Sequence, residues 1–183
     1  LSGLEFDELL RARNVADIGS GAGLPGLPLA VHLPDTHWTL VEATGKKALF
    51  IERAADEMGL DNVSVRAART EDLGADPVSR EQFDAVTARA VGSLSTTAEL
   101  AAPFLRTGGH LLIWRGARDP EVEAEFDAIS EDRLGIVSVE VRPVTPYPGS
   151  RDRHIHLLRK NGPTPEGLPR RPGVAAKRPF GAE

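Results

Sequence analysis

Residues 15–26 constrain this chain more than any other stretch. They read Val-Ala-Asp-Ile-Gly-Ser-Gly-Ala-Gly-Leu-Pro-Gly, so a short apolar run with Val15 and Ile18 leads directly into four glycines, and the apolar segment 27–33 follows. A strand, a glycine turn and a helix in this order bring backbone N–H groups and a helix N-terminus to the edge of a cleft. We therefore predict a nucleotide-binding turn at the end of a first strand.

Two classes of ligand compete for this turn. The glycines fit the dinucleotide pattern Gly21-x-Gly23-x-x-Gly26, but a lone match of this kind is weak evidence. Asp17 separates the classes, because it places a carboxylate at the end of the strand, two residues before Gly19. A fixed anion disfavours a pyrophosphate and favours S-adenosylmethionine, which carries a sulfonium and an ammonium and no phosphate. We predict S-adenosylmethionine as the cofactor, with a dinucleotide and a purely structural turn as the alternatives.

Strand-like and helix-like segments alternate along the chain. The expected strands are 14–18, 36–42, 62–67, 83–88, 110–114, 135–144 and 154–159, and the expected helices are 4–13, one that starts near Leu24, 46–58, 94–105 and 120–129. This alternation predicts an α/β, Rossmann-like fold with a mainly parallel seven-stranded sheet, an antiparallel last strand and helices on both faces. The ligand crevice then lies beyond the carboxyl ends of the parallel strands.

Composition divides the chain into three parts. A length of 183 residues suits one domain, which we place at 14–160, after a short helical segment at 1–13 and before a Pro/Gly-rich arm at 161–183. Residues 151–183 hold 8 Lys or Arg against 3 Asp or Glu, whereas the rest of the chain holds 14 against 24. We expect the arm to be extended, and either to neutralise phosphates or to be a solvated tail. Its basic residues are Arg170, Arg171, Lys177 and Arg178.

Four strand ends carry polar side chains that suit a nucleotide site. Glu42 follows Gly19 by 23 residues and suits the hydroxyls of a ribose, and Thr70 with Glu71 suits an adenine edge. Arg89 suits a carboxylate of the donor or a phosphate of an acceptor, and Arg115 suits an acceptor. The alternatives are a surface carboxylate for Glu42 and a helix-start residue paired with a nearby acid for Arg89, and we expect Trp114, beside Arg115, to pack in the core.

Other kinds of site find little support in the sequence. The chain has no cysteine, which excludes disulfides, thiolate metal sites and a cysteine nucleophile and fits a cytoplasmic protein. His154 and His156 share a strand face without an evident third ligand, so we expect no metal site. No apolar run reaches 18 residues, so we expect no membrane association.

With these motifs the chain resembles the RsmG (GidB) family of bacterial 16S ribosomal RNA guanine-N7 methyltransferases. The residues that carry the resemblance are 17–30 with their Gly-Leu-Pro-Gly extension, 39–42, 45–47, 69–71, 88–90, 93–94, 108–109, 169–173 and 176–179. The resemblance implies a class I fold, S-adenosylmethionine as methyl donor and 16S ribosomal RNA or the small ribosomal subunit as partner, with the guanine at position 527 as target. Guanine N7 already presents a lone pair, so we expect direct transfer without a general base.

The resemblance also assigns residues. The donor-binding positions of the family fall on Gly19, Leu24, Thr70, Glu71 and Arg89, beside which we keep Asp17, Gly21, Gly23 and Glu42. We expect no catalytic base, Arg89 and Arg115 as positioning groups, and RNA binding by Arg115, by the four basic arm residues and by Lys46.

Two differences from the family leave other functions open for this chain. Members usually have a longer helical N-terminal segment, of which 1–13 is a remnant, and Arg115-Gly116 replaces a common Lys-Gly. The alternatives are therefore a class I methyltransferase that acts on a protein or a small molecule, and a donor-binding module that is inactive for lack of that segment. We expect a monomer.

Overall fold

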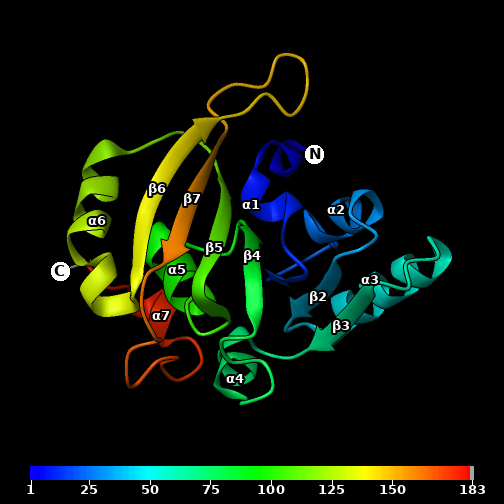
Figure 1. Ribbon diagram of the computed structural model, residues 1–183, viewed down its shortest axis with the longest axis horizontal. Helices are drawn as coiled ribbons and strands as arrows, with labels where there is room; N and C mark the ends of the chain where they lie inside the picture. The colour runs from blue at the N-terminus through cyan, green and yellow to red at the C-terminus, as the bar shows by residue number, and fades with distance from the viewer. Residues whose placement is uncertain (182–183) are drawn as a thin grey trace.

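A seven-stranded sheet forms the centre of the computed structural model, which describes residues 1–181 (Figure 1). The strand order is β3-β2-β1-β4-β5-β7-β6; β7 runs antiparallel to both of its neighbours and the first five strands are parallel. The strands are β1 (Asn14–Ile18), β2 (His37–Glu42), β3 (Val63–Ala67), β4 (Phe83–Arg89), β5 (Leu105–Arg115), β6 (Ile136–Pro143) and β7 (His154–Lys160). The predicted fold class and the antiparallel last strand are confirmed.

Helices cover both faces of the sheet, and Figure 1 shows α3 and α6 at opposite ends of it. One face packs against α1 (Asp7–Leu10), α2 (Gly26–His32) and α3 (Gly45–Glu57). The other face packs against α4 (Thr70–Ala75), α5 (Leu94–Ala101) and α6 (Pro120–Leu134). The 3-10 turn η1 (Ser2–Glu5) and the short helix α7 (Val174–Lys177) complete the elements that lie within residues 1–181. None of the helices in this part of the chain is long and apolar enough to cross a bilayer.

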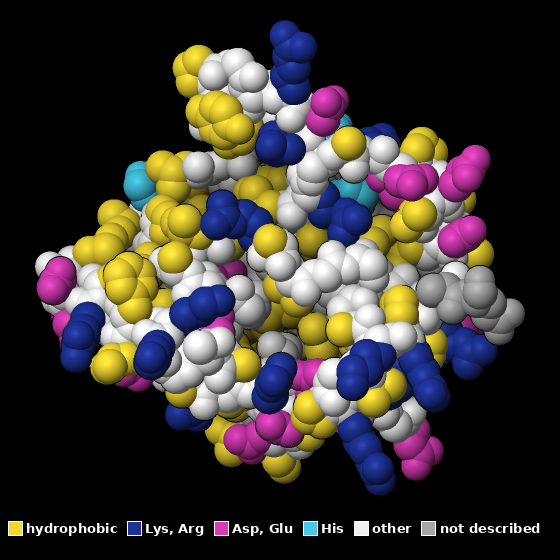
Figure 2. All heavy atoms as spheres, turned by 180° about the vertical axis from the view of Figure 1, so that it is seen from behind, with side chains coloured by type: hydrophobic (Ala, Val, Ile, Leu, Met, Phe, Trp, Pro, Cys, Tyr) yellow, Lys and Arg dark blue, Asp and Glu magenta, His cyan; other side chains and the backbone are white. Residues whose placement is uncertain are grey.

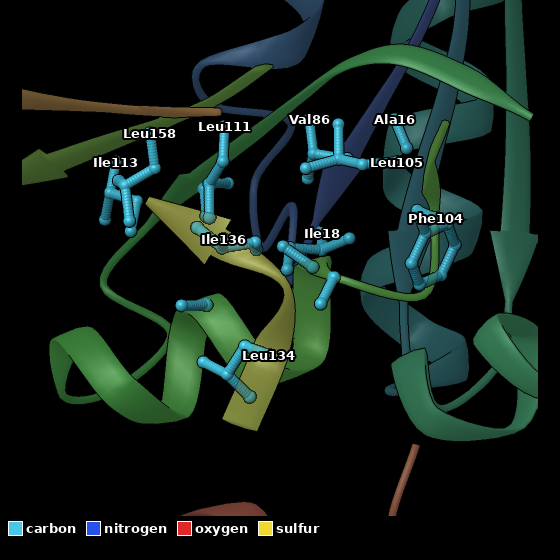
Figure 3. Packing of buried hydrophobic residues seen from close by; sticks show 14 of the residues in the cluster. Ala16, Ile18, Val86, Phe104, Leu105, Leu111, Ile113, Leu134, Ile136 and Leu158 are labelled. Atoms are coloured by element: carbon cyan, nitrogen blue, oxygen red, sulfur yellow. The ribbon is translucent and has the colours of Figure 1, made fainter. Parts of the chain in front are cut away.

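The core divides into two clusters because successive strand residues point to opposite faces. In β1, Ala16 and Ile18 belong to the cluster beneath α5 and α6, whereas Val15 belongs to the cluster beneath α1 to α3. Figure 3 shows part of the first cluster, with Leu134 of α6 lying below side chains that come from the strands. Burial on both faces explains why the central strands read as continuous apolar runs.

Several predicted boundaries are wrong. The expected helix 4–13 is interrupted at Phe6, whose backbone is extended, so only η1 and α1 form there. The expected helix 94–105 ends at Ala101. The strand expected at 110–114 begins at Leu105, so Gly108-Gly109, a pair typical of a turn, lies inside β5, where the pairing with β4 is irregular. The helix after the glycine turn begins at Gly26 and not near Leu24.

Helix α6 also differs from its prediction, since it continues past residue 129 to Leu134. Asp119 caps its first turn by accepting a hydrogen bond from the N–H of Val122. Gly135 ends it in the left-handed conformation, with a φ of 65°, which glycine adopts without strain.

The arm at 161–181 is ordered, because the domain holds it. The buried Nζ of Lys160 donates hydrogen bonds to the carbonyl of Ala102 and to Oγ1 of Thr164, both at 2.7 Å. Leu168 is buried, and its carbonyl accepts a hydrogen bond from Arg80 at 2.8 Å. The arm also contains α7, so the expectation of a wholly extended segment is wrong; residues 182 and 183 of the predicted arm lie outside the described residues.

Candidate active site

The glycine turn connects β1 to α2 as predicted, and its geometry requires glycine. Gly19 has a φ of 63°, and a Cβ atom built there would lie 3.0 Å from Cγ2 of Val91. A Cβ atom at Gly26 would lie 2.9 Å from Oδ2 of Asp17, so the start of α2 packs directly on the end of β1. The turn therefore lets a ligand approach the main chain closely at the carboxyl edge of the sheet.

Glu42 closes the glycine turn from the neighbouring strand. Its Oε2 accepts a hydrogen bond from the N–H of Gly21 at 3.0 Å, and its Oε1 accepts one from the N–H of Thr44 at 2.8 Å. Burial by itself would raise the pKa of Glu42, but these N–H groups outweigh it and hold the pKa below its usual value. The ionised carboxylate at the end of β2 has further lone pairs that these two N–H groups do not use. It can therefore accept hydrogen bonds from the two hydroxyls of a ribose.

Asp17 lies beneath the turn and is not open to the cleft, since its side chain is 0% exposed. Its Oδ1 accepts a hydrogen bond from Oγ1 of Thr87 at 2.7 Å, whereas its Oδ2 lies against Gly26 and accepts no regular hydrogen bond from residues 1–181. Burial raises the pKa of Asp17 to about 6. A cationic ligand bound above the turn would stabilise the ionised form of Asp17 electrostatically. Asp17 would therefore favour such a ligand without touching it.

Thr70 and Glu71 form the first turn of α4, after β3, where the sequence predicted an adenine edge. The structure adds a contact that the sequence did not reveal, because Oε1 of Glu71 accepts a hydrogen bond from the N–H of Gly173 at 2.7 Å. The arm therefore reaches the predicted donor-binding residues from a distance of about a hundred positions along the chain.

The arm is fixed by an ion pair between Arg170 and Glu99, whose side chain is 1% exposed. Nε of Arg170 lies 2.6 Å from Oε1 of Glu99, Nη2 contacts Oε2, and the guanidinium stacks on the ring of Phe180 at 4.0 Å. Arg170 also donates to the carbonyl of Arg178. Arg170 is thus engaged within the protein and is unsuited to the RNA contact that we predicted for it.

The other predicted RNA-binding side chains have no such engagement. Arg171, Lys177 and Arg178 are exposed on the arm, and Lys46 is exposed near the start of α3. Within residues 1–181, none of their side chains forms an ion pair. These four positions remain predictions for RNA binding.

Arg89 and Arg115 end adjacent strands, as predicted, and line a cavity of about 600 Å³. Leu24 and Pro25 of the glycine turn form part of the same wall, so the cavity adjoins the predicted donor site. Trp114, which we expected in the core, is only half-buried and also lines the cavity.

Sequence reasoning missed Tyr147 and Arg153 in the wall of this cavity. They lie on the connection between β6 and β7, which contains two prolines and a glycine and carries no motif that indicates a site. In the described part of the chain, no three His, Cys, Asp or Glu side chains are close enough together to hold a metal ion.

The chemistry of these residues fits S-adenosylmethionine. The glycine turn, Glu42 and the start of α4 lie at the ends of three neighbouring strands, where they can hold an adenosine. The buried carboxylate of Asp17, with one oxygen that accepts no hydrogen bond from the described residues, favours a ligand that is positive at the turn. A pyrophosphate would place negative charge above that carboxylate.

Solved structures with the same fold are methyltransferases. The chain is similar to the mitomycin 7-O-methyltransferase MmcR, with a TM-score of 0.67 and 17% identity over 85% of this chain and 50% of that one. It is also similar to a SAM-dependent methyltransferase from Aquifex aeolicus, with a TM-score of 0.60 and 20% identity over 81% and 82%. The chain therefore has the fold of the class I methyltransferases, and the chemistry of its site fits S-adenosylmethionine.

Sequence comparison gives the family. The family model described as GidB, rRNA small subunit methyltransferase G, matches residues 2–145. The chain is 47% identical to the ribosomal RNA small subunit methyltransferase G of Roseiflexus castenholzii over 165 residues, which are 90% of this chain and 69% of that protein. It is 41% identical to the protein of the same name from Rubrobacter xylanophilus, over 97% of this chain and 69% of that one. The chain belongs to the rRNA small subunit methyltransferase G family, and the predicted resemblance is confirmed.

Proposed function

We propose that this protein transfers the methyl group of S-adenosylmethionine to N7 of a guanine in 16S ribosomal RNA, at the position that corresponds to guanine 527 in the family. Family membership supports the RNA substrate. The observation that carries the choice of a nucleic acid is the cavity beside Leu24 and Arg89, because the described residues of its wall include three arginines and no carboxylate.

The absence of an acidic group from that wall also agrees with the chemistry. When bound, S-adenosylmethionine supplies an electrophilic methyl group on sulfur. The N7 lone pair of guanine forms the new bond to the methyl carbon while the carbon–sulfur bond breaks, its electrons stay on sulfur, and the positive charge passes to the base. No proton leaves the substrate, so the protein needs alignment and not a general base.

The residues of the site divide this work between them. Glu42 would hold the ribose of the donor, and the turn from Gly19 to Leu24 would bind its methionine part, whose positive charge the buried Asp17 would favour. Arg89 ends β4 and lines the cavity together with Leu24 of the glycine turn, so it can position both substrates. We propose that a single chain is active as a monomer, since one chain supplies all of these groups, and that it acts in the cytoplasm.

A methyl-transfer assay tests the proposal. Calorimetry with S-adenosylmethionine and with NADH establishes the donor, and incorporation of tritiated methyl groups into unmodified 16S RNA or 30S particles establishes the acceptor. We expect donor binding, no NADH binding and RNA-dependent incorporation. Donor binding without RNA-dependent incorporation would favour another acceptor or an inactive module, and tight binding of NADH alone would refute the assigned cofactor.

A further inference from the structure

The cavity beside the glycine turn is lined by three arginines that have no ion-pair partner in its wall among residues 1–181. Arg89, Arg115 and Arg153 all line it, and no Asp or Glu among residues 1–181 does. Among residues 1–181, none of these three guanidinium groups forms an ion pair, and Arg115 makes only a hydrogen bond of 3.3 Å to the carbonyl of Gly92. Unbalanced like charges around one hollow favour an anionic ligand.

The pairing of the strands places these cations side by side. Arg89, the last residue of β4, lies opposite Trp114 of β5, and Arg115 lies opposite His154, the first residue of β7. Arg153 directly precedes β7. Because neighbouring strands are about 4.8 Å apart, the three arginines stand at consecutive strand ends along one edge of the sheet. Such a row matches the spaced charges of a polynucleotide backbone better than it matches a single small anion.

An aromatic side chain stands next to this row. Tyr147 lines the cavity and is 55% exposed, on the loop that connects β6 and β7. This loop projects at the top of Figure 1, and the N–H of Val144 donates a hydrogen bond of 2.9 Å to the carbonyl of Arg153 across its base. Figure 2 shows a face of the molecule on which dark blue Lys and Arg side chains surround yellow hydrophobic ones below the loop. An exposed aromatic ring beside unpaired guanidinium groups is the combination that binds single-stranded nucleic acid.

We propose that the cavity binds the target guanine only as part of a phosphodiester chain, with the base stacked on Tyr147 and flanking phosphates held by Arg115 and Arg153. This inference rests on the proposed function and assigns Tyr147 and Arg153 as residues that bind its RNA substrate. Methylation at N7 makes the base cationic, and three unbalanced arginines oppose that charge. The phosphates that flank the guanine in RNA offset this repulsion. A free nucleoside has no phosphates and is therefore a poor substrate.

Variants of the loop test the two contacts. Tyr147→Ala should raise the KM for 16S RNA about 10-fold, while Tyr147→Phe stays near the wild type, because stacking needs the ring and not the hydroxyl. Arg153→Gln should also raise this KM about 10-fold and reduce the slope of log KM against log salt by roughly one. Arg151→Gln is the matched control, since Arg151 is exposed on the same loop and does not line the cavity. Calorimetry should give the same donor Kd for all four variants.

Competition with small probes tests the requirement for phosphate. Guanosine 3′,5′-bisphosphate should inhibit methyl transfer to RNA at concentrations at least about 10-fold below those of guanosine, and Arg153→Gln should reduce this difference, because only Arg115 then remains to hold a flanking phosphate. Equal inhibition by the two probes, or RNA kinetics of Tyr147→Ala and Arg153→Gln that match Arg151→Gln, would overturn the inference. Stronger competition by polyglutamate than by the bisphosphate would assign the cavity to an acidic peptide and would equally overturn it.

The same measurements separate this inference from the proposed function. If the wild type methylates RNA and the loop variants do so equally well, the function stands and the inference fails. If the wild type transfers no methyl group to RNA but binds the bisphosphate through Arg153, the proposed function fails and the cavity is still a site for phosphate-bearing nucleotides.

Discussion

The buried carboxylate of Asp17 gives a prediction with a defined sign. Its pKa is about 6 in the folded protein and 3.8 in the unfolded chain, so it is an acid whose pKa rises on folding. Between these values the folded protein keeps a proton that the unfolded chain has lost, and stability therefore falls as the pH rises through this window. The loss is nearly complete above about pH 7, where Asp17 is ionised in both states.

The size of this effect follows from the shift. A rise of about two pH units corresponds to roughly 3 kcal/mol between the two protonation states. The substituted side chain of the variant Asp17→Asn would be neutral throughout and would still offer an oxygen to Thr87, which donates to Oδ1 at 2.7 Å in the wild type. The free energy of unfolding of the wild type, minus that of Asp17→Asn, should therefore fall by roughly 3 kcal/mol between about pH 4 and pH 7.

Urea unfolding at a series of pH values measures this difference, because other groups contribute equally to both proteins and cancel. A difference that stays constant within about 1 kcal/mol would refute the account of Asp17 as a buried, desolvated acid.

The pH dependence of donor binding is a second test of the pKa of Asp17. A cationic ligand above the turn stabilises ionised Asp17, so the affinity for S-adenosylmethionine should fall below about pH 6, by at most about tenfold per pH unit, and Asp17→Asn should not show this fall. S-adenosylhomocysteine, which lacks the sulfonium charge, should show a weaker dependence.

Three further substitutions test other parts of the site. Glu42→Ala should raise the donor Kd about 10- to 100-fold in calorimetry and leave the KM for RNA unchanged, since it removes charge-assisted hydrogen bonds to the ribose; an unchanged Kd would exclude Glu42 from the donor site. Arg170→Ala leaves Glu99 buried without its cation, which should destabilise the protein by about 3 kcal/mol. Scanning calorimetry should then show a Tm lowered by about 6–10 °C, and a change below about 2 °C would mean that Arg170 does not anchor the arm. Arg89→Ala should lower kcat/KM about 10- to 100-fold and leave the Tm within about 1 °C, because its guanidinium has no ion-pair partner among residues 1–181; unchanged kinetics at limiting donor and RNA would remove it from the site.

Local patterns in the sequence predicted the sheet well, because each strand carries its own signal. The apolar run before Gly19 and the carboxylate at Glu42 define the ends of β1 and β2, and both lie where they were expected. The boundaries that failed depend on partners elsewhere. Gly108-Gly109 reads as a turn, but β5 passes through it because Leu105 pairs with Phe83 of β4.

The arm shows the limit of composition as evidence. Its Pro, Gly and basic residues are typical of a solvated tail, and nothing near Arg170 in the sequence indicates a buried partner. Glu99 lies 71 positions earlier, in a helix whose position only the whole fold determines. The exposure of Tyr147 and the pairing of β7 between β5 and β6 depend on the tertiary structure in the same way.

The chemical identity of the product tests the central claim most directly. Unmodified 16S RNA, incubated with the protein and S-adenosylmethionine and then digested to nucleosides, can be analysed by liquid chromatography and mass spectrometry. The account predicts newly formed 7-methylguanosine at one position of the RNA. A methyl group on another atom or another nucleoside, or none while the donor binds, would contradict it.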